Sequence, residues 1–200
     1  MSRARKYLLL FLSIAAAGAA EKDKAKFKPG PITDYPGRQT VEKVTVAARA
    51  YVTEERAKEA FGKHNPYRHG VLPVLVLIEN STGQTLALDG LRVEYHTAGR
   101  QRAEAVPAAE VRYVSGPNRP GVYTGPPGTS PRVSRRKNPL DAWEIEGRAF
   151  SARMLPAGET ASGFFYFQAT HRGGASLYLT GLREAASGRE LFFFEAPLEE

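Results

Sequence analysis

The apolar run from Val71 to Asn80, VLPVLVLIEN, constrains the fold of this chain more than any other stretch. Every residue from Leu72 to Ile78 is leucine, β-branched or Pro73. The run is too short for a membrane-spanning helix, which needs roughly 20 apolar residues. It ends in the turn-forming sequence ENSTG, so its length and β-branched content predict a buried strand.

Both faces of this strand are apolar, although a strand of an open sandwich normally turns one face to water. Val74, Val76 and Ile78 are therefore expected to face the core. Leu75 and Leu77 lie on the opposite face, which needs a second cover. We expect that cover to be a short helix at about residues 54–62, which follows the N-cap residue Thr53 and ends at Gly62. A partner protein is the alternative cover.

Short segments of alternating polarity, separated by turn-forming residues, occur along the rest of the chain. Their spacing is typical of a sandwich and predicts an all-β fold, an immunoglobulin-like two-sheet sandwich of about eight strands with one short helix. Strands are expected at residues 40–52, 71–80, 85–88, 91–97, 109–114, 147–155, 160–168, 175–183 and 189–196.

The N-terminus predicts export. Basic residues precede the apolar segment Tyr7–Ala17, and small residues follow it, so residues 1–20 have the pattern of a signal peptide that is cleaved after Ala19 or Ala20. Residues 21–39 contain four Lys and three Pro and predict a flexible linker before a domain at 40–200. The leader holds three of the 28 Lys and Arg residues and none of the 21 Asp and Glu residues, which leaves a mildly basic chain of net charge +4.

The absence of cysteine excludes disulfides, thiolate metal ligands and a cysteine nucleophile. An exported chain without disulfides must be held together by its core, which fits a bacterial periplasmic or extracellular protein. No transmembrane span is expected in the mature chain.

One segment, Ser115–Asn138, has nine Gly or Pro residues, five basic residues and no acidic residue. Long loops in compact domains are often functional, so its basic side chains are a candidate contact with an anionic partner. The alternative is a solvated loop that lies across one sheet. The candidate residues are Arg119, Arg132, Arg135, Arg136 and Lys137.

Aromatic residues are concentrated in the last third of the chain. We expect them to fill the core and shield a final sheet, with an exposed docking face as the alternative. The only tryptophan, Trp143, is expected to be a packing anchor. The aromatic residues are Phe164, Phe165, Tyr166, Phe167, Tyr178, Phe192, Phe193 and Phe194.

Two stretches carry a resemblance. The order of the helix, FGK (61–63), VLPVLVLIENST (71–82) and LALDGLRVEY (86–95) resembles exported bacterial immunoglobulin-like β-sandwich proteins of uncharacterised function. FSARMLPAGETASGFFYFQ (150–168) looks like their hairpin. The resemblance implies a sandwich in the cell envelope and implies no activity and no site residues.

No catalytic motif is recognisable, and the four histidines show no metal-ligand spacing. We therefore expect no catalytic residue, cofactor or metal site. The predicted function is a non-enzymatic exported envelope module that binds or scaffolds another macromolecule, either an envelope protein or an anionic envelope polymer, and not a nucleic acid. One alternative is a structural accessory subunit of a larger envelope assembly, and another is a hydrolytic enzyme with an unrecognised site.

Overall fold

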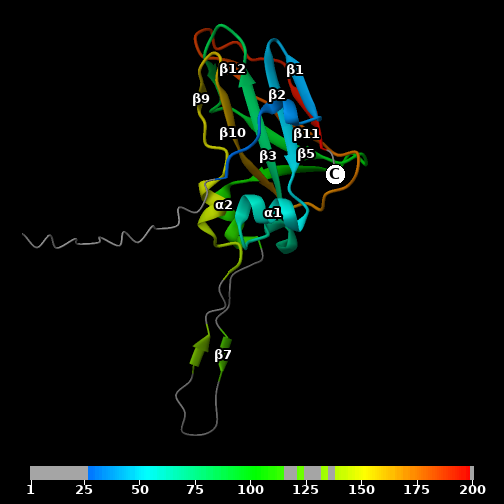
Figure 1. Ribbon diagram of the computed structural model, residues 1–200, viewed down its shortest axis with the longest axis vertical. Coiled ribbons are helices and arrows are strands. Elements are labelled where there is room, and N and C mark those ends of the chain that lie inside the picture. The colour runs from blue at the N-terminus through cyan, green and yellow to red at the C-terminus, as the bar shows by residue number, and fades with distance from the viewer. Residues whose placement is uncertain (1–26, 115–120, 124–131, 135–137, 199–200) are drawn as a thin grey trace, which may run out of the picture.

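The computed structural model describes residues 27–114, 121–123, 132–134 and 138–198. Within these ranges the fold is all-β, as the sequence predicts (Figure 1). The strands are β1 (Arg38–Val41), β2 (Val44–Ala50), β3 (Leu72–Asn80), β4 (Leu86–Ala87), β5 (Arg92–His96), β6 (Arg102–Val106), β7 (Gly121–Tyr123), β8 (Arg132–Ser134), β9 (Met154–Leu155), β10 (Thr160–Phe167), β11 (Ser176–Thr180), β12 (Arg183–Glu184) and β13 (Phe194–Pro197). The helices are α1 (Glu54–Phe61) and α2 (Trp143–Gly147), with 3-10 turns η1 (Ile32–Asp34), η2 (Pro66–His69) and η3 (Ala108–Tyr113).

Eight strands form one continuous sheet in the order β1-β2-β3-β10-β6-β5-β11-β13. The sheet folds over at β6 into two layers, which confirms the two-sheet sandwich. One layer contains β2, β3 and β10, and the other contains β5, β11 and β13. A small sheet, β12-β4-β9, is packed on the same core. In Figure 1, β12 and β9 lie at the end of the molecule opposite α1 and α2.

Strand β3 is the centre of the larger layer, as predicted. It pairs antiparallel with β2 and with β10 along almost its whole length. Every residue of β3 except Glu79 is buried. The inner side chains, Val74, Val76 and Ile78 among them, pack against residues of β5, β11 and β13.

The second face of β3 is covered by several short elements. Leu75 and Leu77 belong to a separate buried cluster that includes Phe61 of α1, so the predicted helical cover is confirmed. Thr53 caps α1 by accepting a hydrogen bond from the Arg56 N–H. Three further elements contribute one buried side chain each to the same cluster: Ile32 of η1, Val111 of η3 and Ile145 of α2.

The predicted linker at residues 21–39 is wrong from residue 27 on. Ile32 and Tyr35 are buried in the cluster that covers the second face of β3, and β1 begins at Arg38. Arg49 of β2 stacks on the Tyr35 ring and donates a hydrogen bond to the Asp34 carbonyl. The lysine and proline content of this segment suggested mobility, but its few apolar residues are used to cover the sheet.

Two predicted strands also differ from the structure. Residues 109–114 fall largely in η3, because Pro107 starts a turn and Val111 alone among them is buried. Residues 147–153 form no strand, and β9 pairs with β4 rather than with β10. A second helix, α2, ends at the first of them, Gly147. Of the long loop 115–138, the described parts form a hairpin in which β7 pairs with β8.

Candidate functional site

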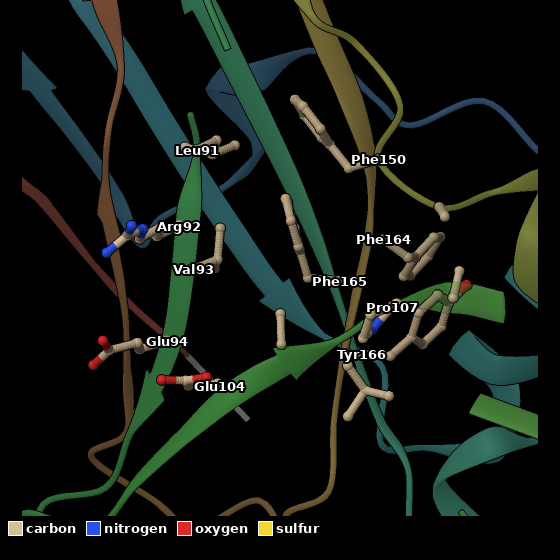
Figure 2. Close-up of a pocket in the computed structure, with 14 residues that line it drawn as sticks. Leu91, Arg92, Val93, Glu94, Glu104, Pro107, Phe150, Phe164, Phe165 and Tyr166 are labelled. Carbon is tan, nitrogen blue, oxygen red and sulfur yellow. The ribbon is translucent and has the colours of Figure 1, made fainter. Parts of the chain in front are cut away.

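Strand β6 is shared by the two layers and marks an opening between them. Its first residues, Arg102–Glu104, pair with β5, and its last two, Ala105 and Val106, pair with β10. Pro107 then leads into η3, so the strand leaves the sheet. Between β5 and residues 164–166 of β10 lies a cleft of about 490 Å³, which we call the β6 cleft (Figure 2).

Two phenylalanines form the apolar wall of the β6 cleft. The rings of Phe150 and Phe165 stack with their centroids 5.2 Å apart and their planes at 23°. Both side chains are only half-buried. Figure 2 shows them between β5 and β10, whereas Phe164 and Tyr166 lie on the other side of β10. This follows from the alternation of side chains along a strand.

Charged side chains stand at the margin of the cleft, and Figure 2 shows those of Arg92 and Glu94 on the side of β5 away from Phe150 and Phe165. Glu94 and Glu104 occupy directly opposite positions of β5 and β6, an arrangement that destabilises a strand pair when both are ionised. His96 Nε2 lies 2.8 Å from a carboxylate oxygen of Glu94. Arg92 is exposed on the same strand. The two carboxylates give the lower part of the cleft in Figure 2 a negative rim that suits a cationic group.

The segment 148–150 crosses β10 and separates this cleft from a second groove. The Phe164 N–H donates to the Arg148 carbonyl (2.8 Å), and the Phe150 N–H donates to the Phe164 carbonyl (3.0 Å). Glycine is required at position 163, because a Cβ there would lie 2.4 Å from the Phe150 Cα. The second groove, of about 520 Å³, shares Ala149 and Phe164 with the β6 cleft and is called the Arg148 groove below.

The guanidinium of Arg148 is surrounded by aromatic rings. Its Cζ lies 5.6 Å from the centre of the Phe27 ring and 6.0 Å from those of Phe61 and Trp143. Nη1 is buried and has no hydrogen-bond partner in the described part of the chain. Burial lowers the pKa of Arg148 below its ordinary value, and the negative charge of Glu144 opposes that shift.

Trp143 is not the buried anchor that the sequence predicts, since 59% of its surface is exposed. It is the first residue of α2, and Ile145 is the buried residue of that helix. Its indole ring lies over Gly147, where a Cβ would be 3.3 Å from Cε3. The side chain therefore forms a wall of the Arg148 groove.

The prediction for the other aromatic residues is confirmed for most of them. Phe164, Tyr166, Phe167 and Phe194 are buried, and Phe165 and Tyr178 are half-buried. Phe192 and Phe193 are exposed by 70% and 48%. Phe193 stacks on Tyr178, which stacks in turn on His96.

A small pocket of about 100 Å³ lies between the N-terminal segment and α1. Tyr35 and Tyr51 line it, and burial raises the pKa of both phenols above the usual value. Arg49, with its Cζ 4.2 Å from the centre of the Tyr35 ring, partly offsets this shift for both. The pocket can hold a few water molecules. Its side chains join residues 27–35 to the rest of the domain.

The basic residues proposed from the sequence are not tested by the structure. Arg132 lies in β8, where its backbone pairs with Tyr123, and its side chain is outside the described part. The other four, Arg119, Arg135, Arg136 and Lys137, lie outside the described residues.

Sequence reasoning missed the residues that line the two grooves. One local signal was present: Gly163 lies inside a strand, directly before four aromatic residues, and glycine in a strand often marks the close approach of another backbone. Phe150 and Arg148, which cross β10 there, carry no such signal. Among the described residues there is no group of three or more His, Asp or Glu placed to hold a metal ion, and no helix long and apolar enough to span a membrane.

No family model and no curated protein matches this chain. Among solved structures, a candidate lipoprotein of Bacillus subtilis matches with a TM-score of 0.36 and 10% identity over 80% of this chain, which spans only 38% of that protein. A Listeria monocytogenes protein of unknown function matches with a TM-score of 0.34, 11% identity and coverage of 80% and 79%. A secreted Mycobacterium tuberculosis protein, MPT63, matches with a TM-score of 0.31, 12% identity and coverage of 79% and 89%. Similarities with TM-scores this low do not indicate what this chain binds.

Proposed function

We propose that this chain is a non-enzymatic module, exported to the bacterial envelope, that binds an extended segment of another polypeptide in the β6 cleft. Export is supported by the signal-peptide pattern of residues 1–20. The observation that carries the binding role is the pairing of β6 with one layer and then with the other, which leaves a cleft between β5 and β10 that has an apolar wall and a charged margin.

The cleft offers an extended chain both shape and charge. Binding of an extended segment beside strands is a common mode of peptide recognition, in which pockets for alternate side chains supply the specificity. An apolar side chain of the partner would pack on the Phe150–Phe165 pair. A lysine or arginine of the partner would neutralise Glu94 and Glu104 and relieve their repulsion.

The test is site-specific photo-cross-linking in cells, with a benzophenone amino acid in place of Arg92 at the cleft or of Glu55 on the exposed face of α1. We expect one envelope polypeptide to be attached at position 92 and not at position 55. Mass spectrometry would then identify the attached segment, and a synthetic peptide of that segment should bind the purified chain.

Glu104→Lys reverses an exposed rim charge without touching the core, so the fold should survive. It should weaken binding of the peptide about tenfold or more, because it replaces an attractive carboxylate by a cation that repels a basic side chain of the partner. Equal labelling from positions 92 and 55, or unchanged binding by Glu104→Lys, would exclude the β6 cleft as the site.

A second candidate function, a structural subunit of a larger envelope assembly, is supported by the exposed Phe192 and Phe193 beside Tyr178. A benzophenone amino acid in place of Phe192 separates the two candidates. Attachment there but not at position 92 would favour the assembly subunit.

A further inference from the structure

The Arg148 groove contains one charge and no group to neutralise it. Of the residues that line the groove, Arg148 alone is ionised at neutral pH. Its guanidinium forms no ion pair or hydrogen bond with any side chain that the structure describes, and Glu144 acts on it only through space. A cation that is partly removed from water is costly unless a partner compensates for it. Three aromatic rings compensate in part, because ring faces attract cations.

The rest of the groove is suited to a flat apolar group. Trp143 forms one wall with most of its surface exposed, and Phe27 and Phe164 also line the groove. Its volume of about 520 Å³ lies within the range of small-molecule sites, about 300–1,000 Å³. Packing of the core does not account for an exposed tryptophan beside an open groove, since the buried side chain of α2 is Ile145.

We propose that the Arg148 groove binds a small planar monocarboxylate, with the carboxylate on the Arg148 guanidinium and the ring system against Trp143. The guanidinium fork matches the geometry of a carboxylate and binds it through two parallel hydrogen bonds. A single cation suits a singly charged anion. The site lies across the 148–150 crossing from the β6 cleft, and the proposal does not depend on peptide binding there.

Trp143 is the only tryptophan of the chain, which makes it a reporter for this groove. Its indole N–H gives a single side-chain tryptophan signal in a nitrogen–proton correlation spectrum. The purified full chain would be titrated with trans-cinnamate, a planar monocarboxylate, and separately with cinnamyl alcohol, its neutral counterpart. We expect cinnamate to shift the indole signal saturably and the alcohol to bind at least about tenfold more weakly, because a hydrogen-bonded ion pair is lost.

Two variants locate the anion. Arg148→Gln should weaken cinnamate about 10- to 100-fold. Glu144→Gln removes a negative charge that acts through space on the guanidinium and on a bound anion, and it should leave the affinity unchanged or raise it a few fold. Arg153→Gln is the matched control, because Arg153 is exposed and lies outside the groove, and its affinity should equal that of the wild type.

Three results would overturn the proposal: no shift of the indole signal at millimolar cinnamate, equal binding of the acid and the alcohol, or equal binding by Arg148→Gln and Arg153→Gln. If Arg148→Gln fails to fold, two measurements still test the proposal. They are the comparison of acid and alcohol on the wild-type chain and the sign of the Glu144→Gln effect.

Discussion

The side-chain oxygen of Gln39 accepts a hydrogen bond of 2.5 Å from the backbone N–H of Glu195. Gln39 lies in β1 and Glu195 in β13, the two edges of the eight-stranded sheet, and no strand ladder joins these edges within the described residues. The edges nevertheless meet, since a Cβ at Gly37 would lie 2.1 Å from the Pro197 carbonyl oxygen. A side chain therefore closes the sandwich where backbone pairing stops, and it occupies edge groups that would otherwise be open to other chains.

Gln39→Ala should lower the free energy of unfolding by about 0.5–1.5 kcal/mol, the usual contribution of one hydrogen bond. The amide of Glu195 should exchange with solvent faster than in the wild type. Thr40→Ala is the control, because the Thr40 hydroxyl bonds that of Thr45 within β1 and β2 and does not reach β13. Urea unfolding and hydrogen exchange measure both effects, and an unchanged Glu195 exchange rate in Gln39→Ala would contradict the closure.

Asn80 should be among the most sensitive polar positions of the fold. Its side chain is fully buried, and the two hydrogens of Nδ2 are shared among the carbonyl oxygens of Gln84, Leu155 and Pro156. Oδ1 accepts from both the N–H and the hydroxyl of Thr82. Asn80→Ala leaves these groups without partners and should cost about 3 kcal/mol in urea unfolding. Thr82→Val removes one of the Asn80 bonds, together with the exposed contacts of the Thr82 hydroxyl with the Gln84 backbone, and should cost about 1 kcal/mol. Equal losses for the two variants would refute this account.

Gly163 is expected to tolerate no side chain. A Cβ at this position would meet the Phe150 backbone at 2.4 Å, and backbone cannot move aside as a flexible side chain can. Gly163→Ala should destabilise the chain by about 1–3 kcal/mol, as overpacking does. Gly83→Ala is matched to it, because nothing lies within 4 Å of a Cβ there. Thermal and urea unfolding should separate the two variants, and similar stabilities would show that the crossing can relax.

The burial of β3 on both faces could be predicted because its signal, an unbroken run of apolar residues, lies within one short segment of the sequence. Leu75 and Leu77 are apolar where water would otherwise favour polar side chains, and the helix that covers them lies directly upstream. The same local reasoning failed for Tyr35, because a segment rich in Lys and Pro shows no periodicity even when its few apolar side chains are buried.

The two grooves could not be predicted, since each is assembled from residues distant in sequence. Glu94 and Glu104 border the same cleft as Phe150 and Phe165 only because β6 pairs with both layers, and no pattern within β6 signals that change. The exposure of Trp143 depends on which side of the short helix α2 is packed against the sheet. The residue type alone favours a largely buried indole. The packing of α2 leaves this one exposed instead.

Alkaline pH should unfold this chain through its buried phenols. Burial raises the pKa of Tyr51 and, most strongly, of Tyr166, whose hydroxyl donates to the Ile145 carbonyl. The folded state thus favours the neutral phenol, while the unfolded chain ionises near the ordinary pKa of about 10. The stability from this difference is complete below about pH 10 and is lost as the pH rises toward the raised pKa values of the folded state.

Each such phenol contributes a slope of about 1.4 kcal/mol per pH unit to the fall of the unfolding free energy above about pH 10. Tyr166→Phe removes one of them, so its curve should be shallower by about that amount, although the variant starts from a lower stability because the bond to Ile145 is lost. Urea unfolding at several pH values gives the slopes, and tyrosinate absorbance reports ionisation. Two results would contradict the view that a protonated Tyr166 stabilises the fold. One is parallel curves of unfolding free energy against pH for the wild type and Tyr166→Phe. The other is ionisation of all the phenols while circular dichroism still shows the folded state.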